Sequence, residues 1–159
     1  MRTIFLGIAV SLLAVGCRSK EAFNFSEDIV KIERKLGESV KETQPQILHY
    51  MQESIYDSLA YVGGDMVKKT EESIDEINAL RMPAINEAAN FKAAAIRYFT
   101  HIRNIYDSYK IYAEQPNDSL RSVEAENMVR LEDGMADMVK EMQGAQQKFA
   151  EANGFKIDN

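Results

Sequence analysis

The fold of this chain is decided by residues 128–152, which read MVRLEDGMADMVKEMQGAQQKFAEA. Apolar side chains recur there at alternating intervals of three and four: Met128, Leu131, Met135, Met138, Met142, Ala145, Phe149 and Ala152. This spacing places one apolar stripe along an α-helix, as in helices that pack inside a bundle. Asn153-Gly154 then predicts a left-handed helix end, with Phe155 folded back on the last turn.

The residues before this stretch predict a third helix and the break that follows it. The segment Gln115-Pro116-Asn117-Asp118 interrupts the helical pattern, and Asp118 or Ser119 is expected to cap the last helix. Pro83 is expected to open the third helix, which runs from about residue 84 to residue 113. The predicted buried face of that helix consists of Ile85, Ala88, Phe91, Ala95, Tyr98 or Phe99, Ile102, Ile105 or Tyr106, Tyr109 and Tyr112.

Residues 26–80 predict two further helices with one reversal between them. Ser26, which two acidic residues follow, is the expected N-cap of the first helix. A single helix over this stretch would be ~80 Å long and would have no partner of matching length. The reversal can fall at Thr43-Gln44-Pro45, at residues 52–58, or at Gly63-Gly64. Equal helix lengths favour residues 52–58, which leaves both glycines inside the second helix at about 1 kcal/mol each.

These four segments predict an all-α fold, an antiparallel up-down-up-down four-helix bundle over residues 26–157. The composition agrees with this prediction, because prolines are few and Ala, Glu, Lys, Met and Leu are plentiful. Residues 17–159 are enough for one domain with a single core.

The N-terminus has the pattern of a bacterial lipoprotein export signal over residues 1–16. After Met1-Arg2, an uncharged apolar run (IFLGIAVSLLAV) is too short to span a bilayer and ends in small residues before Cys17. An ordinary secretory signal with a chance cysteine, or a cytosolic chain with an apolar N-terminus, would also fit the run. The lipoprotein interpretation is favoured because Cys17, the only cysteine, stands where the cleavage belongs. A single thiol also excludes an internal disulfide.

We therefore expect Cys17 to carry lipid after cleavage and residues 17–25 to form a tether to the bundle. Such a tether reaches at most ~26 Å when extended, so the domain would lie close to its membrane. Two or three acyl chains would make the attachment firm. Because Arg18 replaces the acidic residue associated with inner-membrane retention in some bacteria, the outer membrane is the favoured location.

The charge of the chain excludes some classes of partner. Without residues 1–16, which hold one Arg and no acid, 18 basic and 25 acidic residues remain, a net charge of −7. This balance argues against nucleic acid and against electrostatic attachment to anionic lipid. The expected partners are the membrane, through the lipid anchor, and a protein or another component of the envelope.

The two histidines, His49 and His101, are candidate ligands for a haem or for a di-iron site. A haem with two axial side chains would need both rings to point inward and face each other, whereas His101 falls beside the polar stripe of its helix. A di-iron site needs Glu-x-x-His pairs, but Gln46 and Tyr98 stand three residues before the two histidines. The sequence therefore predicts no metal and no cofactor.

Two apolar sets could instead line a small-ligand site. The methionines at 128, 135, 138 and 142 have core spacing, and the tyrosines at 98, 106, 109 and 112 suit the edge of a core, so packing is the favoured interpretation of both. If a ligand binds, the expected ligand-facing residues are Tyr98, Tyr106, Tyr109, Met135 and Met138. Catalytic motifs such as Gly-x-Ser-x-Gly, a phosphate loop or His-Glu-x-x-His do not occur, which predicts a non-enzymatic protein.

Three stretches resemble a poorly characterised family of bacterial surface or exported helical lipoproteins. They are residues 23–30 (FNFSEDIV), residues 91–111 (FKAAAIRYFTHIRNIYDSYKI) and residues 144–157 (GAQQKFAEANGFKI). The chain departs from that pattern at Ser108, where an acid is common, and at Gly63-Gly64. The resemblance implies the location and the helical fold and supplies no enzymatic activity.

The sequence thus predicts a lipid-anchored, non-enzymatic helical bundle of the bacterial envelope that binds a macromolecule or serves as a structural component. The alternative is an extracytoplasmic four-helix bundle that binds a small ligand or a metal.

Overall fold

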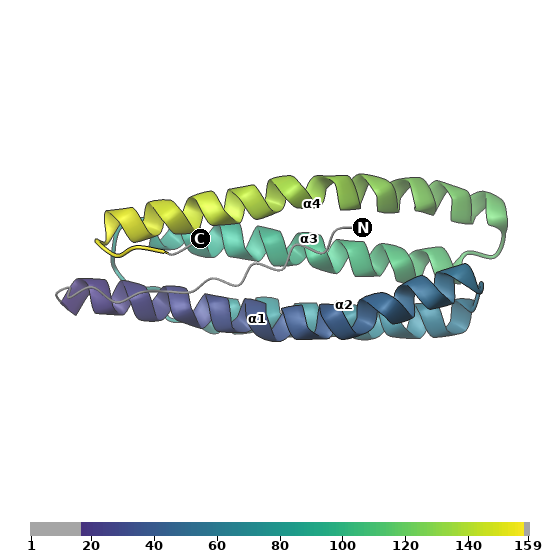
Figure 1. Cartoon of the computed structure of the whole chain (residues 1–159), viewed down its shortest axis with the longest axis horizontal. Coiled ribbons are helices and arrows are strands. Elements are labelled where there is room, and N and C mark those ends of the chain that lie inside the picture. Colours follow the sequence, from purple (N-terminus) through teal and green to yellow (C-terminus); the bar gives the residue numbers. More distant parts are fainter. Residues whose placement is uncertain (1–16, 158–159) are drawn as a thin grey trace.

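The structure is a computed structural model that describes residues 17–157. In this range the chain forms four α-helices: α1 (Cys17–Gln52), α2 (Tyr56–Ala79), α3 (Ala88–Glu114) and α4 (Asp118–Ala152) (Figure 1). Successive helices run in opposite directions along a common long axis. The predicted all-α four-helix bundle is confirmed. The predicted export signal, residues 1–16, lies outside the described residues.

Helix α1 begins earlier than the sequence predicts, and the prediction of a tether over residues 17–25 is wrong. This segment is helical and packs on the bundle: Ala22 and Phe25 are buried, and the Ser19 hydroxyl donates to the Asn153 carbonyl (2.8 Å). The Phe23 ring meets Phe155 edge to face. Contacts with the distant C-terminus therefore extend the helix toward Cys17.

Ser26 is not an N-cap, because it lies inside α1. It is buried there, and its hydroxyl accepts a hydrogen bond from the Gln146 amide of α4 at 3.3 Å. Pro45 also lies within α1, so the chain does not reverse at that proline.

The reversal between α1 and α2 falls at residues 53–55, within the stretch that equal helix lengths favour. Ser54 adopts a left-handed conformation (φ 57°), and the Ile55 amide donates to the Tyr50 carbonyl (2.9 Å). The Ser54 amide donates to Met51, which completes the hydrogen-bond pattern of a Schellman stop. As predicted, Gly63 and Gly64 lie inside α2.

The loop between α2 and α3 is longer than predicted, because α3 begins at Ala88 rather than near residue 84. Pro83 is buried in this loop instead of opening the helix. The Lys92 ammonium reaches back from α3 and donates to the Asn78 and Leu80 carbonyls, each at 2.9 Å. These carbonyls end α2, so a cation satisfies acceptors that the helix leaves free.

The two ends of α4 are set by local side-chain and backbone geometry. Its N-cap is Asn117, whose side-chain oxygen accepts from the Leu120 amide (3.0 Å), so the expected cap at Asp118 or Ser119 is one or two residues late. The predicted stop is confirmed: Gly154 is left-handed (φ 73°), and the Phe155 amide donates to the Ala150 carbonyl (3.1 Å).

An aromatic cluster anchors the end of the bundle at which α1 begins. The ring of Phe149 stacks on Phe91 (centroids 5.3 Å apart) and meets Phe25 and Phe155 edge to face. Phe91 and Phe149 have no exposed surface. The cluster joins α1, α3 and α4 with the residues after α4, so this end is closed by burial of large apolar side chains.

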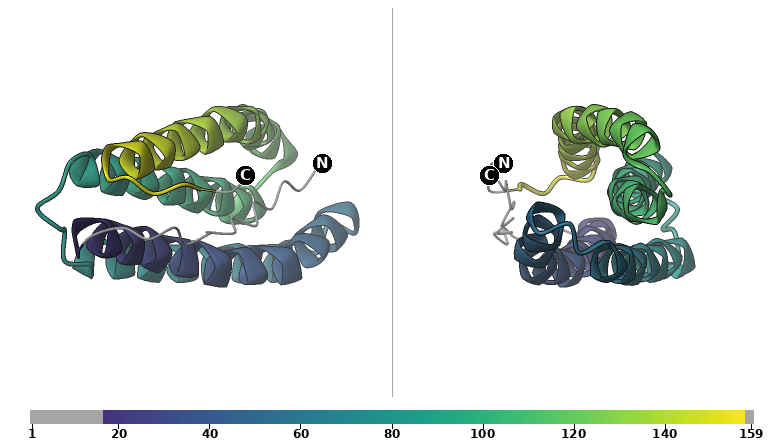
Figure 2. Two further views of the ribbon diagram at one scale, coloured as in Figure 1. Left: turned by 60° about the vertical axis from the view of Figure 1, so that its left-hand side comes forward. Right: turned by 90° about the vertical axis from the view of Figure 1, so that its right-hand side faces the viewer.

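The pairs of neighbouring helices differ in how closely they pack. Helix α3 packs along both α2 and α4, and α2 packs along α1, whereas α1 meets α4 at few positions. The right-hand view of Figure 2, which looks nearly along the helices, shows α4 lying over α3 and away from α1. On the predicted stripe of α4, only Met128, Met142 and Phe149 are buried; Leu131, Met135, Met138 and Ala145 are half-buried, and Ala152 is exposed.

Candidate functional site

The predicted ligand-facing tyrosines lie on α3, toward the side on which α1 and α4 diverge. Tyr98 interacts with Glu33 of α1, and Tyr109 contacts both α1 and α4. Their positions on α3 differ by eleven residues, so the two rings are separated by about 16 Å along the helix axis. They therefore form two separate polar points on one side of the bundle.

The Tyr109 hydroxyl connects three helices. It donates to Oε1 of Glu132 on α4 at 2.6 Å, and a second hydrogen bond joins it to the Gln44 side chain of α1. Burial, followed by the hydrogen bond to Glu132, raises the pKa of Tyr109 well above its usual value. The hydroxyl therefore stays protonated and acts as a donor to a carboxylate.

Eleven residues earlier on α3, Tyr98 lies beside the Glu33 carboxyl group of α1. Burial raises the pKa of Glu33 from 4.5 to about 7, and the positive charge of Arg34 only partly offsets this effect. Burial and the charge of Glu33 raise the pKa of Tyr98. Glu33 is therefore able to exchange a proton near neutral pH, which an ordinary surface glutamate does not do.

The other predicted residues are placed differently. Tyr106 is buried beside Tyr109, with ring centroids 6.1 Å apart, and burial raises its pKa. Met135 packs against the core from α4, and Met138 is half-buried on the same helix. The structure thus brings Tyr106 and Tyr109 together and keeps Tyr98 apart from them. Ligand binding by any of the five residues stays a prediction.

The two histidines lie in unrelated surroundings. His49 is exposed on α1 and contacts the neighbouring ring of Tyr50. His101 of α3 places Nε2 2.7 Å from the Leu131 carbonyl of α4, next to Gly134. A side chain at 134 would begin 3.2 Å from the His101 ring, so Gly134 makes room for this contact. The imidazole acts here in helix packing.

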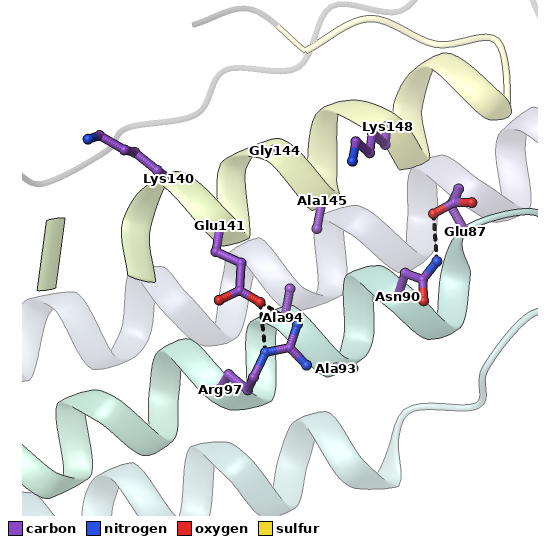
Figure 3. Close-up of a pocket in the computed structure, with 10 residues that line it drawn as sticks. All are labelled: Glu87, Asn90, Ala93, Ala94, Arg97, Lys140, Glu141, Gly144, Ala145 and Lys148. Atoms are coloured by element: carbon purple, nitrogen blue, oxygen red, sulfur yellow. Dashed lines mark hydrogen bonds and ion pairs between the residues drawn. The ribbon is translucent and has the colours of Figure 1, made fainter. Parts of the chain in front are cut away.

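A depression of about 450 Å³ lies between α3 and α4 (Figure 3). Its floor is formed by small residues, and Arg97 and Glu141 pair across it, with Nε and Oε1 2.8 Å apart. The Glu87 carboxylate accepts from the Asn90 amide at its edge. The depression is lined by Glu87, Asn90, Ala93, Ala94, Arg97, Lys140, Glu141, Gly144, Ala145 and Lys148. Both lysines are exposed, and the exposed arginine already has a carboxylate partner.

Neither the buried carboxyl group of Glu33 nor the depression between α3 and α4 could be recognised from the sequence. Glu33 occupies a helix position next to Arg34 and reads as an ordinary surface acid; its burial depends on tertiary packing. The depression is lined by charged and small residues typical of a solvated helix face. One available signal was the coincidence of Ala93-Ala94 on α3 with Gly144-Ala145 on α4, since small residues on facing helices leave space between them.

Cys17, the predicted lipidation site, is the first residue of α1. Among residues 17–157, no helix combines the length and the apolar character needed to cross a bilayer. Within the same range, no three His, Cys, Asp or Glu side chains come together as a metal site would require.

Comparisons with protein-family models, with curated proteins and with solved structures found no match to this chain. The resemblance to helical envelope lipoproteins therefore stays a prediction, while the four-helix fold rests on the structure itself.

Proposed function

We propose that this protein is a lipid-anchored, non-enzymatic helical module of the bacterial envelope that binds another macromolecule or serves as a structural component. The observation that carries the proposal is the position of Cys17. It follows an uncharged apolar run of signal length, and the described chain is helical from Cys17 onward. In this proposal the acylated cysteine joins the bundle directly, without a flexible linker.

This arrangement would give the anchor a mechanical consequence. Helix α1 has 36 residues, so its far end lies about 54 Å from Cys17 along the helix axis. Because residues 17–52 are helical, the lipid would hold one defined end of the bundle at the membrane. The opposite end would be presented to partners. The outer membrane is the favoured location, because Arg18 stands after the cysteine in place of the acidic residue associated with inner-membrane retention.

The anchor is tested by growing cells with a radioactive fatty acid and isolating the full-length protein. The wild type is expected to carry the label, and Cys17→Ala is expected to lose it. Lys20→Ala, which changes an exposed residue three positions away, serves as the control and should remain labelled. Label retained by Cys17→Ala would contradict acylation at this residue.

A second candidate function, extracytoplasmic binding of a small ligand or metal, is favoured by one observation. Tyr98 with Glu33, and Tyr109 with Glu132, form polar points on the side where α1 and α4 meet least. Native mass spectrometry, metal analysis and visible absorption of the purified protein test this function. A retained ligand or metal that is lost in Tyr109→Phe would support it, and a colourless, metal-free protein without added mass would contradict it.

A further inference from the structure

The charge of this bundle is concentrated at one end. We divide the helices at mid-length into a proximal half, which contains Cys17 (residues 17–35, 68–101 and 135–157), and a distal half (residues 36–67 and 102–134). The proximal half holds thirteen basic and twelve acidic residues, a net charge of +1. The distal half holds five basic and twelve acidic residues, a net charge of −7. The acidity of the whole chain therefore resides in the distal half.

The tip of the distal half also exposes apolar side chains. The α1–α2 turn and the α3–α4 turn lie together at this end (Figure 1). Ile55 of the first turn is 40% exposed, and Leu120 and Val123 in the first turns of α4 are 45% and 63% exposed. Leu120 and Val123 are three residues apart and thus adjacent on the helix surface. Large apolar side chains in such a group are typical of contact surfaces.

A contact between the two turns fixes these residues at the same tip. The Arg121 guanidinium lies 3.9 Å from the centre of the Tyr56 ring and pairs with Asp118 at 2.8 Å. Arg121 follows Leu120, and Tyr56 follows Ile55, so this stacking holds the two apolar residues at the same end. Tyr56 also meets Tyr112 of α3 edge to face. The surface is therefore built on packed helix ends rather than on a loose loop.

The acids around this surface outnumber the cations available to them. Glu53, Asp57 and Glu126 are exposed at the tip, and Glu126 lies three residues beyond Val123 on α4. Two basic residues of the distal half are already engaged, since Arg121 pairs with Asp118 and Lys110 pairs with Glu114. An apolar centre with an acidic rim is complementary to a segment that carries apolar and basic side chains.

We propose that the distal tip, composed of Ile55, Leu120 and Val123 with the rim Glu53, Asp57 and Glu126, docks a basic amphipathic segment of a protein partner. This inference rests on the proposed function and specifies its binding surface. The chemistry disfavours two other occupants. The distal tip of a second copy would bring like charges together, and an anionic membrane surface would repel the rim.

The test uses the full processed protein and a synthetic helical peptide of Leu and Lys, with a Leu/Glu peptide of equal length as the charge-reversed probe. Isothermal titration calorimetry should detect binding of the Leu/Lys peptide alone. The double variant Leu120→Ser/Val123→Ser should weaken this binding by about tenfold or more, because two apolar side chains no longer lose contact with water. Val129→Ser is the matched control, since Val129 is a 58% exposed valine elsewhere on α4.

The electrostatic part is tested in the same titration. Glu53→Gln/Glu126→Gln should weaken binding severalfold, and the effect should shrink when salt rises from about 0.05 M to about 0.5 M. Glu21→Gln/Glu72→Gln, which removes two exposed acids of the proximal half, is the control and should leave binding unchanged. Circular dichroism verifies that every variant remains helical.

Three results would overturn the proposal. They are equal binding of the Leu/Glu peptide, wild-type affinity in Leu120→Ser/Val123→Ser, and self-association of the protein that this double variant abolishes. Fatty-acid labelling of Cys17 is independent of all three, so a failure of the docking surface and a failure of the anchor give different results.

Discussion

The α2–α3 interface and the α1–α4 side of the bundle show two ways of placing helices next to each other. At the first, a Cβ built on Gly63 would lie 3.1 Å from the Lys110 amide nitrogen and from the Tyr106 carbonyl oxygen, so the two backbones touch. At the second, α1 and α4 meet at few positions, and a chain of polar groups links them through α3. Close packing at the α2–α3 interface stabilises the fold, whereas the α1–α4 side contains polar groups whose charge and contacts can change.

The largest difference between the two sides is expected from a pair of methionines. Met66 of α2 has no exposed surface, and Met66→Ala should lower the free energy of unfolding by about 2–5 kcal/mol. Met138 of α4 is half-buried, and Met138→Ala should cost less than about 1 kcal/mol, because water already reaches part of the side chain. Urea denaturation followed by circular dichroism measures both. Equal losses would mean that Met138 is packed as fully as Met66.

The pH dependence of stability gives the next largest effect. The pKa of Glu33 is raised to about 7 in the folded protein, so between pH 4.5 and 7 the folded state holds a proton that the unfolded state releases. The stabilisation is complete below about pH 4.5 and is lost as the pH rises through 7, by up to about 3 kcal/mol.

Glu33→Gln should remove this part of the pH dependence and stabilise the protein at pH 8, as measured by urea denaturation at several pH values. Glu38→Gln, an exposed acid of the same helix, should leave the wild-type pH profile unchanged. A profile of Glu33→Gln that parallels the wild type between pH 5 and 8 would show that Glu33 titrates normally.

The two glycines of α2 test the close approach itself. Gly63→Ala should lower the free energy of unfolding by about 1 kcal/mol, because the clash with α3 backbone exceeds the gain in helix propensity. Gly64→Ala meets only the Lys110 side chain at 3.7 Å and should raise stability by about 1 kcal/mol. The midpoint temperature of thermal unfolding should therefore fall in Gly63→Ala and rise in Gly64→Ala. A stabilising Gly63→Ala would place α2 and α3 farther apart than described.

The smallest effect is expected from the polar link on the open side. Tyr109→Phe removes the donor to Glu132 and should cost about 1 kcal/mol. Tyr61→Phe, which alters a 78% exposed tyrosine of α2, should change nothing measurable. Hydrogen exchange would show the loss concentrated in α4 if the hydroxyl holds that helix. Unchanged exchange in α4 would remove Tyr109 as a link between the helices.

The sequence predicted those parts of the fold that depend on local pattern. The four helices follow from apolar periodicity, and Gly154 ends α4 because glycine readily adopts the left-handed conformation. The end of α1 was found only approximately, because Ser54 takes that conformation without being a residue that signals it. The start of α1 was missed, because Ser19 and Phe23 are ordered by partners more than a hundred residues away.

The candidate site was less predictable than the fold. Helical spacing placed Tyr98 and Tyr109 on one side of α3, yet their polar partners Glu33, Gln44 and Glu132 come from two other helices. The stripe of α4 predicted packing inside a bundle, but complete burial also requires a helix on the other side. Since α1 does not close over α4, Leu131 and Met138 remain half-buried. A pattern shows which residues share a face and leaves open how closely that face is covered.

The central claim of the proposed function is that Cys17 joins the bundle directly to a membrane, with helix rather than a flexible linker following the modified residue. Mass spectrometry of the N-terminal peptide, from protein extracted from membranes with detergent, tests this most directly. We predict a mature chain that begins at residue 17, with a diacylglyceryl group on its sulfur. A chain that begins at another residue, or an unmodified Cys17 in membrane-associated protein, would contradict the claim.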